Sequence, residues 1–192
     1  MPGSHMVYTG NIVFESENRK RKDRHTLKNI VLIGMPGAGK STVGVVIAKK
    51  LGYRFMDSDL VIQERTGKML HESIEEKGTE GFLEVEGEIN ASLCCDRTVI
   101  ATGGSVVYSA KAMEHLKEIG NVVYLQLSCE AVAERLGDLQ ERGVALKEGQ
   151  TLRDLYEERT PVYERYADLT LNCEGKMIRE VVAELAARLD GR

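Results

Sequence analysis

Residue types and spacing that suit phosphate chemistry occur first in the stretch GMPGAGKS, residues 34–41. It matches the pattern G-x-x-x-x-G-K-[ST] and lies between an apolar, β-branched run and a segment with helical spacing. In such a loop the backbone N–H groups and the helix N-terminus bind nucleotide phosphates. We expect these contacts from Gly37, Ala38, Gly39, Lys40, Ser41 and Thr42. The structural alternative is a glycine-rich turn that only starts a helix.

Lys40 and Ser41 have separate expected roles within this loop. The lysine would reach the β- and γ-phosphates, and the serine hydroxyl would bind Mg²⁺. The sequence has no N-K-x-D segment of the kind that GTPases use to recognise their base. A nucleotide and Mg²⁺ are therefore predicted ligands, and the short chain favours a small-molecule kinase.

The second stretch whose residues could take part in catalysis is FMDSD, residues 55–59. Asp57 is suited to hold a Mg²⁺-bound water, and Asp59 is suited to orient or deprotonate an acceptor hydroxyl. The alternative is structural, because Ser58 or Asp59 could cap the helix that follows. The carboxylates are expected at a sheet edge where ligands bind, which favours the catalytic interpretation.

The elements that must position these residues follow an alternating pattern. Strands are expected near residues 30–33, 53–57, 98–103, 121–127 and 167–172. Helices are expected near residues 41–51, 59–77, 80–94, 109–119, 129–136, 151–166 and 176–189. The alternation predicts a three-layer α/β/α fold with a central parallel five-stranded sheet. Ligands in such sheets bind outside the carboxyl ends of the strands.

Composition and charge narrow the class of protein. The 192 residues carry a net charge of −4, which gives no general attraction to nucleic acid or to anionic membranes. No apolar run approaches the roughly 20 residues that span a bilayer. The four cysteines form no C-x-x-C pair, which fits reduced thiols. We expect a cytoplasmic monomer without a nucleic-acid or membrane partner.

The N-terminal segment, residues 1–28, is set apart from the expected kinase domain at residues 29–192. GSHM at residues 3–6 has the form of an expression scar, and residues 7–28 form a polar extension. The extension contains RKRKDRH, which is interpreted as a hydrated charge run rather than a nucleic-acid arm.

Six motifs give the chain a resemblance to the shikimate kinase family of P-loop kinases. They are GMPGAGKST, FMDSD, GFLEVE, ATGGSVV, LQERG and ERTPVYERYA, and the resemblance runs from about residue 29 to residue 189. It implies ATP-dependent, Mg²⁺-dependent phosphorylation of shikimate to 3-phosphoshikimate, a step of aromatic amino acid biosynthesis. It also implies a mobile lid at about residues 137–150.

The resemblance assigns further residues one by one. Arg142 resembles the lid arginine that closes over the transferring phosphoryl group, and Arg135 resembles the arginine near adenine. Arg159 matches the arginine that binds the acceptor's carboxylate. The remaining implied acceptor contacts are Asp59, Glu86, Gly103 and Gly104. The alternatives are a solvated loop for Arg142, and pairing with Glu157 or Glu164 on the helix surface for Arg159.

Three positions depart from the family pattern. Leu83 replaces the arginine of the motif F-R-x-x-E, Ser105 replaces the third glycine, and Gly143 replaces the proline after the lid arginine. Leu83 could form an apolar wall for another acceptor or simply pack in the core. Divergence within a true shikimate kinase and a changed hydroxylated acceptor both remain open. A nucleotide-binding regulator without turnover is the competing class, although it would be expected to lose Asp59 or Arg142.

Overall fold

The computed structural model describes residues 28–136 and 149–190. Within them lies one sheet of five parallel strands in the order β2-β3-β1-β4-β5. The strands are β1 (Asn29–Ile33), β2 (Arg54–Asp57), β3 (Thr98–Ala101), β4 (Gly120–Gln126) and β5 (Leu169–Asn172). The predicted parallel five-stranded sheet is confirmed.

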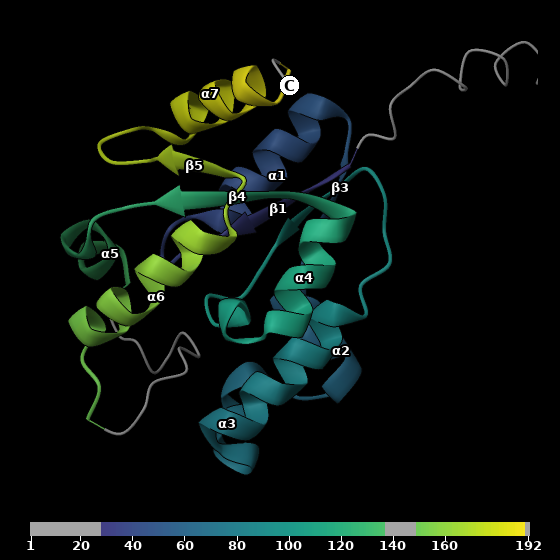
Figure 1. The fold of residues 1–192 in the computed structure, drawn as a ribbon, viewed down its shortest axis with the longest axis vertical. Coiled ribbons are helices and arrows are strands. Elements are labelled where there is room, and N and C mark those ends of the chain that lie inside the picture. The colour runs from purple at the N-terminus through teal and green to yellow at the C-terminus, as the bar shows by residue number, and fades with distance from the viewer. Residues whose placement is uncertain (1–27, 137–148, 191–192) are drawn as a thin grey trace, which may run out of the picture.

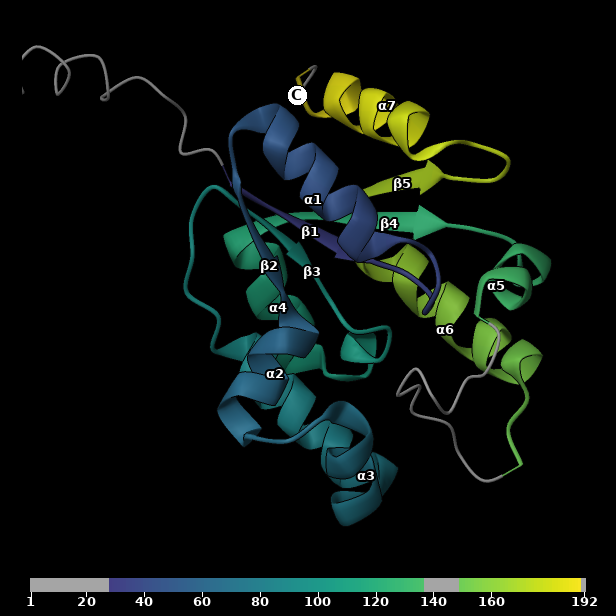
Figure 2. The same cartoon turned by 180° about the vertical axis from the view of Figure 1, so that it is seen from behind.

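Helices cover both faces of the sheet, as expected for a three-layer fold. They are α1 (Lys40–Leu51), α2 (Ser58–Thr66), α3 (Leu70–Ala91), α4 (Ala110–Ile119), α5 (Cys129–Leu136), α6 (Leu152–Tyr166) and α7 (Ile178–Asp190), with a short 3-10 turn η1 (Val106–Tyr108). Figure 1 shows α4 and α6 in front of the sheet. The reverse view in Figure 2 shows α1 and α7 on the opposite face.

The central strands are apolar along their whole length because both of their faces are covered. In β1, Val31, Leu32 and Ile33 are fully buried, and β4 is buried in the same way from Val122 to Leu125. Continuous apolar runs of this kind are typical of parallel strands between two helical layers. The core therefore runs through the middle of the sheet, and the polar chemistry is confined to the strand ends.

One predicted helix, at residues 59–77, is two helices in the structure. Helix α2 ends at Thr66 because Gly67 adopts a left-handed conformation with φ of 67°, a backbone geometry that glycine tolerates and that ends a helix. Helix α3 begins at Leu70 and continues past the expected break, with a kink at Gly78. The prediction of a single helix up to residue 77 was therefore wrong.

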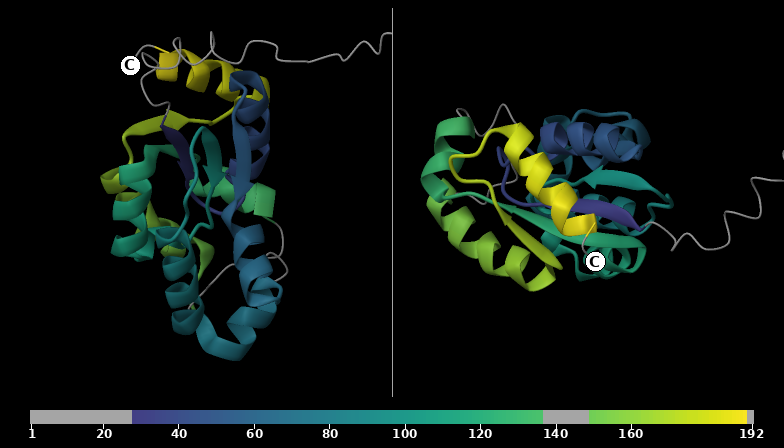
Figure 3. Two further views of the ribbon diagram at one scale, coloured as in Figure 1. Left: turned by 90° about the vertical axis from the view of Figure 1, so that its right-hand side faces the viewer. Right: turned by 90° about the horizontal axis from the view of Figure 1, so that it is seen from above.

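The carboxyl ends of β1, β2 and β3 meet at one edge of the sheet, since β1 and β2 both pair with β3. Helices α2 and α3 extend beyond that edge, which is clearest from the side in Figure 3. This arrangement brings the loop after β1, Asp57 and the glycines after β3 into one region. None of the helices in residues 28–136 and 149–190 is long and apolar enough to cross a membrane.

Candidate active site

A cavity of about 400 Å³ opens at this edge of the sheet. It lies between the loop after β1, helices α2, α3 and α6, and the glycines after β3. Its lining includes Gly37, Gly39, Lys40, Ser41, Thr42, Asp59, Phe82, Glu86, Gly103, Gly104, Ser105, Arg135 and Arg159. Most residues that the sequence analysis assigned to nucleotide and acceptor are thus brought to one place.

Lys40 is the cation at the floor of the phosphate loop. Its side chain is buried, and its ammonium donates hydrogen bonds to the carbonyl oxygens of Gly34 at 2.9 Å and Met35 at 3.0 Å. Burial lowers the pKa of Lys40 to about 8, against the opposing effect of the nearby Asp59 carboxylate. An anionic phosphate in the cavity would favour the charged lysine.

Ser41 and Asp57 are brought together across α1 and β2. The Ser41 hydroxyl donates a 2.6 Å hydrogen bond to Asp57 Oδ2. Asp57 Oδ1 accepts a 3.1 Å bond from the backbone N–H of Asp59, which makes Asp57 the N-cap of α2. The capping alternative for Ser58 or Asp59 was therefore wrong. Ser58 instead accepts a 3.3 Å bond from the N–H of Gly103.

Asp59 and Glu86 face the same point beside Gly103. A Cβ added to Gly103 would lie 2.1 Å from Glu86 Oε1 and 2.9 Å from Asp59 Oδ1, so only glycine fits there. Burial, followed by the charge of Asp57, raises the pKa of Asp59 to about 6. Burial also raises the pKa of Glu86 to about 7, with Asp59 adding to the effect. Two carboxyl groups thus approach the cavity from α2 and α3.

Arg159 reaches the other side of the cavity from α6. It is 1% exposed, which is inconsistent with the predicted alternative of a pair with Glu157 or Glu164 on the helix surface. A Cβ added to Gly104 would lie 3.1 Å from Arg159 Nη1, so the guanidinium lies directly against the second glycine. The cavity therefore has carboxyl groups beside Gly103 and a guanidinium beside Gly104.

Comparisons with known proteins agree with this geometry. A family model described as shikimate kinase matches residues 36–190. The chain is 35% identical over 164 residues to a shikimate kinase of Persephonella marina, covering 85% of this chain and 99% of that protein. It is 40% identical over 162 residues to a shikimate kinase of Geobacter sulfurreducens, covering 83% and 89%. The chain belongs to the shikimate kinase family.

The fold of a solved structure supports the same family. The shikimate kinase from Acinetobacter baumannii in complex with shikimate has a TM-score of 0.75 and 31% identity, covering 86% of this chain and 94% of that one. Shikimate kinases use ATP as co-substrate, and the chain is accordingly an ATP-dependent small-molecule kinase. The predicted P-loop kinase fold and reaction class are confirmed.

Leu83, which replaces an arginine of the shikimate kinase motif, does not line the cavity. It packs with Ile62, Phe82 and Ile89 in a small apolar cluster between α2 and α3. The interpretation as core packing is therefore supported over an apolar wall for the acceptor. The cavity of this shikimate kinase homologue is thus lined by Arg159, but by no arginine from position 83.

Ser105, the second departure from the shikimate kinase pattern, lies beside the Glu86 carboxyl. Burial raises the pKa of Glu86, and the nearby Ser105 hydroxyl acts in the opposite direction. Glu86 Oε1 is buried and has no hydrogen-bond partner within the described part of the chain. A buried, unsatisfied oxygen of this kind costs free energy unless a ligand binds it.

A second cavity of about 510 Å³ adjoins the phosphate loop on the side of α7. Arg135 at the end of α5 lines both cavities, as suits an arginine near the nucleotide base. No sequence motif predicted the other wall of this second cavity, which includes Cys173, Lys176, Met177 and Val181. The signal was present, because residues 173–177 follow the carboxyl end of β5, where ligands collect. Arg142 and most of the expected lid lie outside the described residues.

Proposed function

We propose that this chain transfers the γ-phosphoryl group of ATP to a hydroxyl of shikimate. The observation that carries the proposal is the arrangement around Gly103 and Gly104. Asp59 and Glu86 face the first glycine and Arg159 faces the second, with Lys40 lining the same cavity. An acceptor with a carboxylate at one end and hydroxyls at the other matches this distribution of charge.

The roles of the residues follow from phosphoryl-transfer chemistry. Arg159 binds the acceptor's carboxylate, and Asp59 orients the attacking hydroxyl and accepts its proton. Glu86 binds a neighbouring hydroxyl, which supplies the partner that its Oε1 lacks among the described residues. Lys40, with Arg142 from the lid, offsets the charge on the γ-phosphoryl oxygens. Catalysis is then mainly positioning and charge neutralisation.

Mg²⁺ belongs to the same proposal, with Ser41 and Asp57 as its protein contacts. Both side chains offer hard oxygen atoms, and their mutual 2.6 Å hydrogen bond shows that they reach one position. Mg²⁺ is commonly held by one or two protein oxygens together with substrate phosphates and water. The ion would neutralise charge on the β- and γ-phosphates.

The oligomeric state, the cellular location and the lid are also part of the proposal. We infer a monomer that works in the cytoplasm, where ATP is supplied, with residues 137–150 as the lid. The support is the family membership and the location of the nucleotide and acceptor residues within one chain.

A second acceptor is worth testing because of Leu83. The cavity has one guanidinium from α6 and none from position 83. A carboxylate would therefore bind less tightly there than in a site that also has an arginine at position 83. Another hydroxy acid or a polyol is therefore the alternative substrate class. A binding protein without turnover is less favoured, because Asp59 is in place beside Gly103.

The deciding experiment measures ADP release in a coupled assay with ATP and Mg²⁺. Shikimate is compared with a panel of hydroxy acids and polyols, and nucleotide binding is measured separately by calorimetry. Turnover of shikimate supports the proposal. Turnover of another acceptor alone would replace shikimate, and normal ATP binding without any turnover would favour a regulator.

A further inference from the structure

Tyr108 in η1 makes a contact that none of the sequence motifs predicts. The Nε of Arg159 donates a 3.2 Å hydrogen bond to the Tyr108 hydroxyl. The guanidinium carbon also lies over the Tyr108 ring, 5.1 Å from its centroid. The tyrosine thus contacts Arg159 in two ways, by a hydrogen bond and by a cation–π contact.

The phenol also lies near the carboxylate of Glu158, the residue before Arg159 on α6. Burial raises the pKa of Tyr108, and the nearby Glu158 adds to this effect. Glu158 in turn accepts a 2.7 Å bond from Gln150 Nε2. The Tyr108 hydroxyl therefore lies between Arg159, which donates a hydrogen bond to it, and a carboxylate that is itself hydrogen-bonded to Gln150.

The far side of the guanidinium is constrained by Gly104. Arg159 Nη1 lies against this glycine, and the Gly104 carbonyl accepts a 2.6 Å hydrogen bond from the Tyr163 hydroxyl. Tyr163 is buried and stacks on Tyr124 with ring centroids 5.1 Å apart. Helix α6 therefore contacts the segment after β3 at two residues, Gly104 and Tyr108.

We propose that Tyr108 is a positioning residue for the acceptor: it holds Arg159 so that this guanidinium binds the acceptor's carboxylate without an arginine at position 83. The tyrosine does not line the cavity, so it acts through Arg159. Holding the arginine in one rotamer removes an entropy cost that binding would otherwise include. This inference rests on the proposed function, because it assumes an acceptor with a carboxylate.

The test compares Tyr108→Phe with the wild type in steady-state kinetics. The variant keeps the ring over Arg159 and loses only the hydroxyl. Hydrogen bonds to charged groups justify an expected rise of about tenfold in the acceptor KM. The ATP KM and kcat should stay unchanged, because neither depends on Arg159 being held. Tyr108→Leu removes the ring as well and should raise the acceptor KM further.

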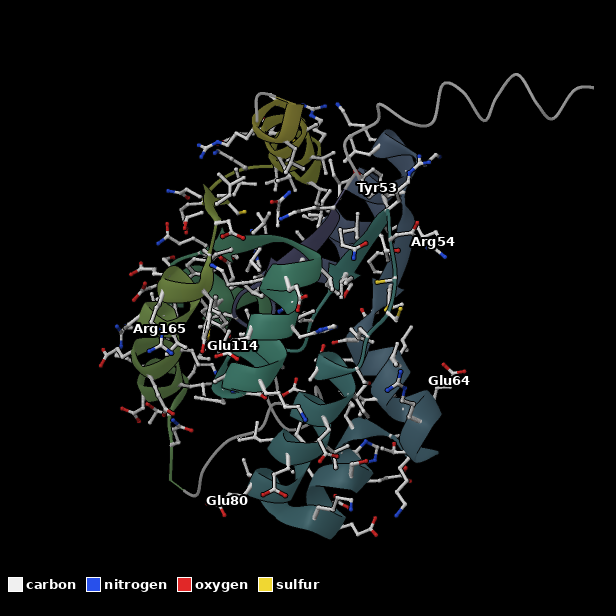
Figure 4. All side chains as sticks on the ribbon, turned by 45° about the vertical axis from the view of Figure 1, so that its right-hand side comes forward. Tyr53, Arg54, Glu64, Glu80, Glu114 and Arg165 are labelled. Carbon is white, nitrogen blue, oxygen red and sulfur yellow. The ribbon has the colours of Figure 1, made fainter. Side chains whose placement is uncertain are left out.

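A matched control exists on the same helix. Arg165 donates a 3.3 Å bond to the Tyr166 hydroxyl and lies 4.9 Å from that ring centroid. Arg165 is exposed on the outer side of α6 (Figure 4), and neither Arg165 nor Tyr166 lines the cavity. Tyr166→Phe removes the same chemical contact and should leave the acceptor KM unchanged.

A double-mutant cycle identifies the route of the effect. In an Arg159→Lys background the donor Nε is absent, so adding Tyr108→Phe should not raise the acceptor KM again. The inference is overturned if Tyr108→Phe has the wild-type acceptor KM. It is also overturned if the variant lowers kcat, both KM values and the melting temperature together, since that pattern indicates general structural damage.

Failure of the proposed function gives a different result. The wild-type protein is assayed first with shikimate, and no turnover there overturns shikimate as the substrate. The Tyr108 comparison is then made with whichever hydroxy acid of the panel is phosphorylated. An unchanged KM for that acid overturns the role of Tyr108, whereas a selective rise supports it.

Discussion

The Ser41 hydroxyl donates a 2.6 Å hydrogen bond to Asp57 Oδ2 and so joins the start of α1 to the end of β2. This bond holds the phosphate loop and the carboxyl end of β2 in fixed positions relative to each other. Both oxygens suit Mg²⁺, whereas no group of three or more acidic, histidine or cysteine side chains within the described residues could hold a metal. The ion would therefore depend on the bound nucleotide for further ligands.

Asp57→Asn should raise the Mg²⁺ concentration needed for half-maximal activity by about tenfold, because one charged contact is weakened. The measurement is a Mg²⁺ titration of ADP release at saturating ATP and acceptor. Removing Mg²⁺ with EDTA should abolish turnover in both proteins. Identical Mg²⁺ titrations would remove Asp57 from the metal site.

Asp59→Asn should lower kcat by at least about a hundredfold, the usual contribution of a positioned general base. ATP should still bind with wild-type affinity, since the phosphate loop is intact. Calorimetry of ATP binding beside the kinetic assay separates the two effects. Asp96→Asn, at an exposed carboxylate paired with Arg54, is the control that should change neither. Retained turnover in the Asp59 variant would show that another group assists the hydroxyl.

Glu86→Gln should change how stability depends on pH. Folding raises the pKa of Glu86 from an ordinary 4.5 to about 7, so the folded state binds the extra proton between those values. The free energy of unfolding therefore falls as pH rises through that range, by roughly 3 kcal/mol in total. The variant lacks this ionisation, so its stability relative to the wild type should increase from pH 5 to pH 8.

Urea unfolding of both proteins at the two pH values measures this difference. Glu84→Gln, on the exposed side of the same helix, is the matched control and should show no such dependence. An equal difference between wild type and Glu86→Gln at pH 5 and pH 8 would mean that Glu86 stays ionised in the folded state.

Much of the fold, and the residues gathered in the candidate nucleotide site, could be predicted from local signals. The loop at residues 34–41 and the strand ends at Asp57 and Gly103 follow from short patterns and from the rule for parallel sheets. The break at Gly67 was missed because a single glycine within a helical pattern can continue a helix or end it. The left-handed backbone that decides the matter is visible only in the structure.

The side of the cavity proposed for the acceptor was less predictable because its contacts join distant parts of the chain. Tyr108 and Arg159 are 51 residues apart in sequence and meet only when α6 packs beside η1. The direction of Leu83 depends on how α2 packs on α3, which the pattern of α3 alone does not specify. From the sequence, Ser105 is only a missing glycine, whereas in the structure it lines the same cavity as Glu86.

Leu83→Arg tests whether the acceptor site is otherwise that of a shikimate kinase. Position 83 precedes Glu86 by three residues on α3, so an arginine there is a neighbour of the Glu86 carboxyl. One additional charged hydrogen bond to a carboxylate should lower the KM for shikimate by about tenfold. The lost apolar contact with Ile62 and Phe82 should reduce stability by about 1 kcal/mol.

Leu83→Met is the control, since it keeps an apolar side chain of similar volume and should leave the KM for shikimate unchanged. Thermal unfolding of both variants verifies that they are folded under the assay conditions. If the folded Leu83→Arg variant does not have a lower KM for shikimate, the carboxylate of shikimate does not bind near position 83 of α3. The loss of the arginine would then be a change of acceptor, and the hydroxy acids and polyols of the panel would become the leading substrates.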